Sequence, residues 1–503
     1  MTVRRVARQS SAVSRGPSRG PGAERYRRAM ADLERKRNEE LARILHQLAW
    51  SPERLAREVN LLLPQALAIS KTAPYKWRDR GMVPRAPHDQ TVCEVLSRAV
   101  GIAVTYQQLW GRMGSHRGAR VLSALLLTDA WDADTAQLAL REAAADAVPV
   151  RLTDLFRGDA LARVASHWAE PAPAVTGGEG ALRIAPSQLS DLRLGHDSKR
   201  RLERSCGGGL VLAPARAELA MAGKLLELGS YAFDERLGRG LYGEAARLAH
   251  LVGRANDDLG HEAAAQRAFV AALRAAQLSG DLRLGAGILG SLVVQITHHS
   301  AHTAGRGADP VALLDIGLAA ADGLLTPRQR ARQLGRSALA HGWQGDRAGV
   351  EAASTRAFAL LEQQGAGEAG DGGAGGGDAA GDSGAVGADA GGAGAGGGVR
   401  ADDRAELAGL VGEGYLFLDD HGRARPLLIR AVRELSAERA RDRALLMVRL
   451  ADSYRRTGER EQAARTADQA RRLAAGMQSG RVARALRDID AALREVDAAQ
   501  RPA

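Results

Sequence analysis

The sequence is poor in cysteine and has no long apolar run, which excludes several classes of protein. Its two cysteines, Cys93 and Cys206, are too few for a zinc site or a disulfide framework. The longest apolar run, from Val121 to Leu127, is much shorter than the roughly 20 residues that a membrane-spanning helix needs. No apolar stretch follows Arg4 and Arg5, so this pair does not form an export signal. We therefore expect a cytoplasmic protein that does not enter a membrane.

Aromatic residues are also scarce and make up 4% of the 503 residues. Aromatic and β-branched residues favour strands, and both are sparse here beside alanine, leucine and arginine. The composition therefore predicts an all-α protein. Its length is enough for about three domains.

Positive charge is concentrated at one end of the chain. Residues 1–37 contain eleven Arg or Lys against three acids, which accounts for most of the net charge of +11. We expect residues 1–23, rich in Ser, Gly, Pro and Arg, to be a disordered basic arm, and a long helix to follow from Glu24. Such an arm suits the phosphate backbone of DNA, because binding there releases counterions. A solvated charge run without a partner is the alternative.

Residues 51–110 contain a regular order of helix signals. Ser51-Pro52 marks a helix start, since the serine hydroxyl can cap and the proline needs no amide partner. Thr72 is expected to cap a second helix, which ends before Gly81. A third helix is expected over residues 90–100, where apolar side chains recur at core spacing.

This order resembles the helix-turn-helix of XRE/Cro-type regulators, which has the lambda-repressor-like fold. The matching residues are Leu55, Ala56, Ile69, Ser70, Lys71, Thr72, Trp77, Gly81, Pro84, Leu96, Gly101 and Leu109. The resemblance implies that the second helix, from Thr72 to Arg80, enters the major groove of DNA. We expect Trp77 to lie in the core, where an aromatic residue at this end of the helix normally packs.

Under this resemblance, two sets of side chains would contact double-stranded DNA. The expected base-edge or flanking contacts are Lys71, Thr72, Tyr75 and Lys76. The expected phosphate contacts are Arg78, Arg80 and Arg85. Tyr75 is explained equally well as a core residue. One such domain binds DNA weakly, so we expect a homodimer that contacts two half-sites.

Two departures from the family pattern support a different hypothesis. Leu55 and Trp77 are 22 positions apart, whereas the family spacing is about fourteen, and Pro74 occupies an aliphatic core position. The long turn could have cost the motif its DNA binding. The protein would then be a scaffold that acts only through protein contacts.

The second half of the chain is helical and repetitive. Turn signatures recur at 259–261, 344–346, 421–423 and 457–459, and Gly422 and Gly458 are 36 positions apart. This spacing is close to the tetratricopeptide period of about 34, and the region resembles a degenerate array of such repeats. The resemblance implies an α-solenoid with a concave groove that is free for a protein or peptide ligand.

These features predict a domain order along the chain. The expected parts are a basic arm (1–23), a helix-turn-helix domain (24–113), a helical connector (114–209), repeats (210–364), a disordered insert (365–398) and further repeats (399–497). The insert contains 17 glycines in 34 residues and no basic residue, so it is either a tolerated loop or an acidic strand that competes with DNA. The combination resembles actinomycete regulators of the NsdA type, negative regulators of differentiation and antibiotic production.

No motif in the sequence predicts catalysis or a cofactor. Residues 238–243 fit the pattern GxGxxG, but no buried strand precedes them, so we treat the match as chance. His298 and His302 could share one helix face as metal ligands, yet no acid or cysteine lies near them in the sequence. A surface or groove-lining role is the alternative. We therefore expect a repressor without enzymatic activity, bound metal or cofactor.

Overall fold

The computed structural model describes residues 37–63, 67–85, 87–100, 104, 109–110, 131–145, 155–156, 159–175, 180, 182–231, 234–299, 309–370 and 401–499. The chain divides into two compact units, Met1–Val121 (unit 1) and Leu122–Ala503 (unit 2). Within the described residues the only strands are β1 (Leu182–Arg183) and β2 (Gly229–Ser230), paired in parallel. The predicted all-α class is confirmed.

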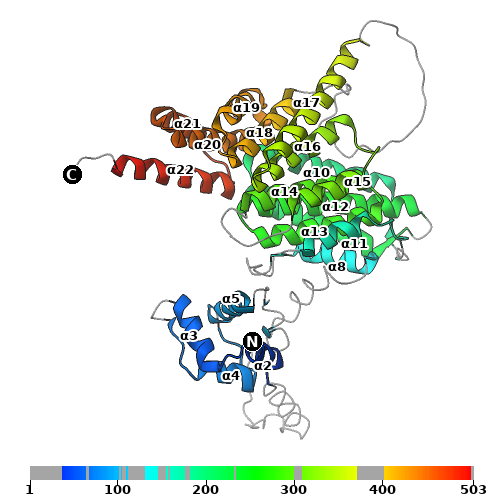
Figure 1. Cartoon of the computed structure of the whole chain (residues 1–503). Helices are drawn as coiled ribbons and strands as arrows, with labels where there is room; N and C mark the ends of the chain where they lie inside the picture. Colours follow the sequence, from blue (N-terminus) through cyan, green and yellow to red (C-terminus); the bar gives the residue numbers. More distant parts are fainter. Residues whose placement is uncertain are drawn as a thin grey trace, which may run out of the picture. The chain divides into compact units, whose positions relative to one another are not determined.

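Unit 1 contains four described helices. They are α2 (Glu39–Gln47), α3 (Pro52–Leu62), α4 (Ala73–Arg80) and α5 (His88–Val100), drawn in blue in Figure 1. The signals at Ser51 and Gly81 are confirmed, because the Ser51 hydroxyl accepts a hydrogen bond from the Arg54 amide and Gly81 ends α4 with φ of 60°. Trp77 is buried, as predicted, and its ring meets that of Trp110 edge to face at 6.2 Å.

The cap predicted at Thr72 is wrong. Thr72 precedes α4, but its hydroxyl does not bond to a backbone amide of the helix. It lies instead 3.2 Å from the Ser70 hydroxyl. Pro74 is buried in the first turn of α4, where its missing amide proton costs nothing. A buried proline therefore fills the position at which an aliphatic residue was expected.

Unit 2 is built from the remaining described helices (Figure 1). They are α8 (Ala133–Ala144), α9 (Asp159–Ala169), α10 (Pro186–Cys206), α11 (Gly208–Leu228), α12 (Glu235–Leu259), α13 (Glu262–Ser279), α14 (Leu282–His299), α15 (Pro310–Ala320), α16 (Pro327–Gln344), α17 (Arg347–Gly370), α18 (Ala401–Phe417), α19 (His421–Glu434), the 3-10 turn η4 (Ala437–Arg439), α20 (Ala440–Arg456), α21 (Arg460–Leu473) and α22 (Gly480–Ala499).

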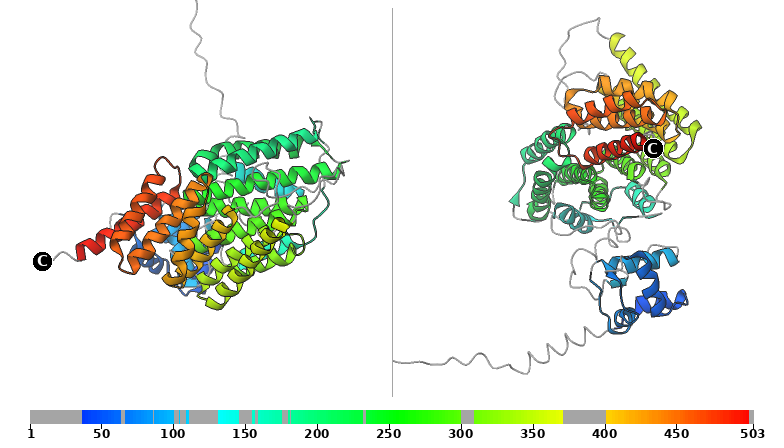
Figure 2. Two further views of the ribbon diagram at one scale, coloured as in Figure 1. Left: turned by 90° about the horizontal axis from the view of Figure 1, so that it is seen from above. Right: turned by 90° about the vertical axis from the view of Figure 1, so that its left-hand side faces the viewer.

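From α12 to α21 the helices pack in successive pairs. The pairs are α12 with α13, α14 with α15, α16 with α17, α18 with α19, and α20 with α21. The first helices of neighbouring pairs also contact one another, from α12 through to α20. Helix α10 contacts both α12 and α20, and α22, the red helix in Figure 2, also contacts α12 and α20, so these two helices connect the two ends of the array.

The segment predicted as a connector is instead part of the core of unit 2. Leu140 in α8, Trp168 in α9 and Leu192 in α10 are buried in one hydrophobic cluster with α11 to α15. The Arg274 side chain of α13 donates to the Thr135 hydroxyl of α8 over 2.9 Å. The prediction failed because α8 and α9 pack against α11, α13 and α15, helices that are too distant in the sequence for local spacing to indicate.

Most of the predicted repeat turns lie where glycine allows a positive φ. Gly260, Gly345 and Gly458 have φ between 80° and 85° and follow α12, α16 and α20. The turn predicted at residues 421–423 is wrong by a few residues, since α19 already begins at His421. Asp419 adopts the positive φ of 56° there. Residues 238–243 lie inside α12, so the glycine pattern there is helical.

Some predictions fall outside the described residues. These are the basic arm, most of the helix expected from Glu24, and the insert beyond α17, which itself extends to Gly370. Among the helices that the structure describes, none combines the length and apolar character needed to cross a bilayer.

Helices α16 and α18 approach closely because both lack a side chain at their contact. A methyl group on Gly342 would overlap the Gly414 carbonyl oxygen, and one on Gly414 would lie 2.8 Å from the Ala338 carbonyl oxygen. We predict that Gly342→Ala destabilises unit 2 by about 1–3 kcal/mol through overpacking. Gly223→Ala in α11 is the matched control, since its methyl group would meet no atom within 4 Å. That change should be neutral or stabilising by up to ~1 kcal/mol. Equal free energies of unfolding in urea for the two variants would contradict the prediction.

Candidate functional site

The first candidate site is the exposed side of α4. Lys71, Thr72, Lys76, Arg80 and Arg85 are exposed. Within the described part of the chain, none of these four cationic side chains takes part in a salt bridge or hydrogen bond. Four positive charges in and beside one short helix therefore remain available to an anionic partner. This set, Lys71, Lys76, Arg80 and Arg85, is called the α4 cation set below.

Two other predicted contact residues already have partners. The Arg78 guanidinium donates twice to the Asp79 carboxylate, over 2.7 and 2.9 Å, and lies 5.1 Å from the centre of the Tyr75 ring. The Tyr75 hydroxyl donates to Glu53 at the start of α3, and this hydrogen bond is the main reason that the pKa of Tyr75 is raised. Both side chains are half-buried; Tyr75 ties α4 to α3 through Glu53, whereas Arg78 contacts residues of α4 itself.

Two asparagines fix the position of α4. Asn60 in α3 bonds to both backbone groups of Ile69, accepting from its amide over 2.8 Å and donating to its carbonyl over 3.0 Å. Asn38 caps α2, its backbone amide donates to the Arg78 carbonyl over 2.7 Å, and its side chain donates to the Leu109 carbonyl over 2.6 Å. The connection between α3 and α4 is thus held at its far end, although it is long for a helix-turn-helix.

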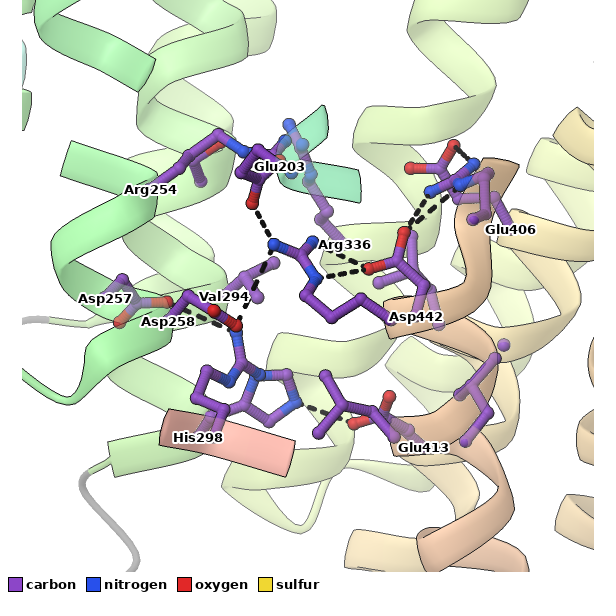
Figure 3. Close-up of a pocket in the computed structure, with 18 of the residues that line it drawn as sticks. Glu203, Arg254, Asp257, Asp258, Val294, His298, Arg336, Glu406, Glu413 and Asp442 are labelled. Carbon is purple, nitrogen blue, oxygen red and sulfur yellow. Dashed lines mark hydrogen bonds and ion pairs between the residues drawn. The ribbon is translucent and has the colours of Figure 1, made fainter. Parts of the chain in front are cut away.

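The second candidate site is a cavity of about 150 Å³ in unit 2, lined by helices from α10 to α22 (Figure 3). Its wall contains a network of ionised groups centred on Glu203, which has no exposed surface. Glu203 bonds to Arg441 of α20, and it accepts from Arg254 of α12 over 2.9 Å. Asp258 of α12 accepts from the Gly208 amide over 2.7 Å. A single network therefore joins helices far apart in the sequence.

Further carboxylates continue the network toward α18. Arg439 bonds to both Asp442 (2.9 Å) and Glu406 (2.7 Å), and Glu406 also lies 3.2 Å from Arg332. Burial alone would raise the pKa values of these two carboxyl groups, but the surrounding guanidinium groups hold both well below the ordinary range. Both acids are therefore ionised near neutral pH and bind their arginines as full ion pairs.

His298 lies at the edge of the same cavity, as Figure 3 shows. Its Nε2 is 2.6 Å from Glu413, and its Nδ1 is 2.8 Å from an Arg481 nitrogen. Because a guanidinium group only donates, Nδ1 accepts and the neutral ring donates from Nε2. Burial, more than any other cause, lowers the pKa of His298, which agrees with this neutral form. The acidic partner that was not apparent from the sequence is Glu413, 115 positions away.

The metal hypothesis for His298 therefore has little support. Both ring nitrogens are occupied by side chains, and His302 lies outside the described residues. Among the residues that the structure does describe, no group of three or more His, Cys, Asp or Glu is placed to hold a metal ion. The alternative prediction, that His298 lines the groove, agrees with its place in the cavity wall.

The sequence analysis missed a second, more basic cavity beside the first. It is lined by arginines from α10, α12, α14 and α16, and it shares Arg254, Arg336, Glu406 and Arg439 with the first cavity. A signal was present, because Arg200 and Arg204, and likewise Arg332 and Arg336, are four positions apart and so share one helix face. Each pair alone is typical of a solvated helix surface, so the spacing did not indicate a cavity.

The comparisons with known proteins concern unit 1 alone. A family model described as the SP15 N-terminal domain matches residues 41–109, from within α2 to Leu109. This part of the chain, which includes α3, α4 and α5, is therefore similar to that domain. No curated protein and no solved structure matches the chain.

The two Asn60 hydrogen bonds generate a prediction about the position of α4. Asn60→Ala leaves both backbone groups of Ile69 without these partners, and we expect it to cost about 1–3 kcal/mol of local stability. Asn60→Asp keeps the acceptor and should have an intermediate effect. Hydrogen exchange of the α3 and α4 amides measures the free energy of opening. Unchanged protection in Asn60→Ala would show that the loop is held by other contacts.

The neutral His298 generates a prediction about pH. The ordinary histidine pKa is about 6.5, and the folded value is lower, so the unfolded chain binds the extra proton first as pH falls. The contribution of His298 to the free energy of unfolding should therefore be fully present above pH 6.5 and should decrease below it. Each unit of pKa difference contributes about 1.4 kcal/mol. Burial raises the pKa of Glu413, but the nearby charges of Arg449 and Arg481 act to lower it, so Glu413 changes stability only below its ordinary pKa of about 4.3.

Thermal unfolding between pH 7.5 and 5 measures this effect. We expect the melting temperature to fall with pH in the native sequence and to fall less in His298→Gln, which cannot take up the proton. The glutamine amide can still donate to Glu413, so the hydrogen bond is matched. An equal or steeper fall in the variant would contradict the assignment of a neutral His298.

Proposed function

We propose that the protein is a DNA-binding transcriptional regulator, a repressor of differentiation or secondary metabolism, in which unit 1 contacts double-stranded DNA. The observation that supports this proposal is the α4 cation set, exposed and without internal ion pairs. Such charges displace counterions from DNA phosphates, and this term supplies most non-specific affinity. Lys76 lies on the same helix as buried Trp77, and the buried Pro74 and Trp77 turn it outward.

In this proposal the two kinds of residue in α4 have different roles. Lys71, Thr72 and Lys76 contact or flank the bases, while Arg80 and Arg85 bind phosphates. Tyr75 positions the helix through Glu53, and Arg78 is held within α4 by Asp79. Unit 2 supplies a tetratricopeptide-like array for dimerisation or for binding a partner. A dimer of the chain would contact two half-sites and so reach a useful affinity.

The scaffold hypothesis is favoured by one observation, namely the internal hydrogen bonds of Tyr75 and Arg78. Under this hypothesis α4 only completes the core of unit 1, its side chains serve to stabilise that core, and the exposed cations have no binding role. The two hypotheses differ in what happens when the α4 cation set is neutralised.

The test is recovery of bound DNA across the genome of the native host with the tagged protein. The variant combines Lys71→Ala, Lys76→Ala and Arg80→Ala, and the control is Arg43→Ala, an exposed arginine of α2 that bonds to Glu40. We expect discrete sites with the native protein and the control, and their loss in the triple variant. Equal recovery with the triple variant, or no enrichment with any protein, would favour the scaffold.

The salt dependence of DNA binding in solution measures how much each phosphate contact contributes. For each phosphate contact removed, the slope of log affinity against log salt should decrease by about 0.9. We therefore expect Arg80→Ala to reduce the slope by about one without changing the preferred site. If Arg80→Ala leaves the slope unchanged, Arg80 does not contact a DNA phosphate.

A further inference from the structure

The second cavity of unit 2 is unusually rich in arginine. Its volume is about 90 Å³, and its wall includes His196, His250 and eight arginines. The eight arginines are Arg200, Arg204, Arg247, Arg254, Arg283, Arg332, Arg336 and Arg439. This second cavity is called the arginine cavity below. Among the residues that line it, Glu406 is the only acid.

The arginines converge because each helix repeats them on one face. Arg200 and Arg204 lie one turn apart on α10, and Arg332 and Arg336 lie one turn apart on α16. Arg254 comes from α12, which contacts α10 directly. Side chains four positions apart project from the same side of a helix. Three helices thus direct positive charge into one space.

Carboxylates balance only part of this charge. Arg332 and Arg439 share Glu406, at 3.2 and 2.7 Å, and Arg254 is paired with Glu203. Arg439 also pairs with Asp442, and Arg247 and Arg283 lie 3.5 and 4.0 Å from Asp281. Arg336 donates to two neutral groups, the Gly287 carbonyl and the Gln333 side chain, each over 3.3 Å. The Nε of Arg204 is buried and has no hydrogen-bond partner within the described part of the chain.

The lowered pKa values of two buried groups, Arg204 and His250, agree with an excess of positive charge. Burial, and then the neighbouring Arg200, Arg439 and Arg254, lower the pKa of Arg204 well below its usual range. The pKa of His250 is lowered well below its usual range by burial, and next by Arg254. An anion in the cavity would reduce both the cost of burying these cations and their mutual repulsion, since it would pair with them and replace lost hydration.

We propose that the arginine cavity binds a small organic phosphate with two or more phosphate groups. Guanidinium groups bind phosphate through paired N–H donors, and tetrahedral phosphate oxygens can accept from several helices at once. The cavity volume of about 90 Å³ is several times the roughly 10–15 Å³ that a single water requires, so the cavity can admit a group larger than water.

This inference goes beyond the proposed function and does not depend on DNA binding. The test is titration calorimetry of the full-length protein with inorganic pyrophosphate, and with citrate as a carboxylate of similar charge. We expect saturable binding of pyrophosphate and at least about tenfold weaker binding of citrate. No heat from pyrophosphate at low salt would overturn the proposal, and citrate binding of equal strength would overturn the assignment to phosphate.

Variants locate the binding site. Arg204→Gln combined with Arg336→Gln removes two donors, and we expect at least about tenfold weaker pyrophosphate binding. The matched control is Arg433→Gln on α19, whose side chain is 75% exposed and lies outside the cavity. The triple variant of the α4 cation set excludes binding by unit 1 and should bind pyrophosphate as the native protein does.

The melting temperature without ligand separates loss of binding from loss of folding. Because Arg204→Gln and Arg336→Gln relieve repulsion, the double variant should melt no lower than the native protein. If it does melt lower, Arg200→Lys tests the same site conservatively, since lysine keeps the charge but loses the paired donors. Unchanged pyrophosphate affinity in both variants would overturn the proposal.

Discussion

One buried ion pair, between Glu203 of α10 and Arg441 of α20, holds unit 2 together. The two residues are 238 positions apart, and Glu203 has no exposed surface. Breaking a buried pair costs up to about 3–5 kcal/mol when it leaves a charge uncompensated, and here Glu203 would keep only Arg254 while Arg441 would keep Asp442 and Asp258. An arrangement in which α10 did not meet α20 would leave both charges without this partner. The pair therefore selects the curvature of the helical array as well as stabilising it.

Further contacts that connect the two ends of the helical array accompany this one. Once α10 lies against α20, the Asp258 carboxylate is placed to accept from Ser479 over 2.8 Å, just before α22 begins. Arg481 of α22 then reaches Asp257 and His298. The groove expected to be free for a peptide is thus partly filled by two helices of the chain itself. What remains are two adjoining cavities with charged walls, which suit a small ionic ligand better than an extended peptide.

The sequence predicted what is determined locally and missed what is determined at long range. Helix ends at Gly260, Gly345 and Gly458 were recognisable because a positive φ favours glycine. The turn before α19 was misplaced because Asp419, a non-glycine residue, takes that conformation. The partners Glu413 for His298 and Arg441 for Glu203 could not be found from spacing, since neither pair shares a helix. Of the predicted DNA contacts, the charge was recognisable and the internal hydrogen bond of Tyr75 was not.

The same distinction explains how unit 1 can tolerate its unusual sequence. The 22-residue spacing between Leu55 and Trp77 would leave α4 poorly oriented if only the connection determined its position. Instead, Asn60 holds Ile69, four positions before α4 begins, and Asn38 holds the backbone near the end of α4 at Arg78. A helix fixed at both ends needs no short turn. Lys76 can then project from a rigid surface, and a rigid surface is what selective contact with DNA bases requires.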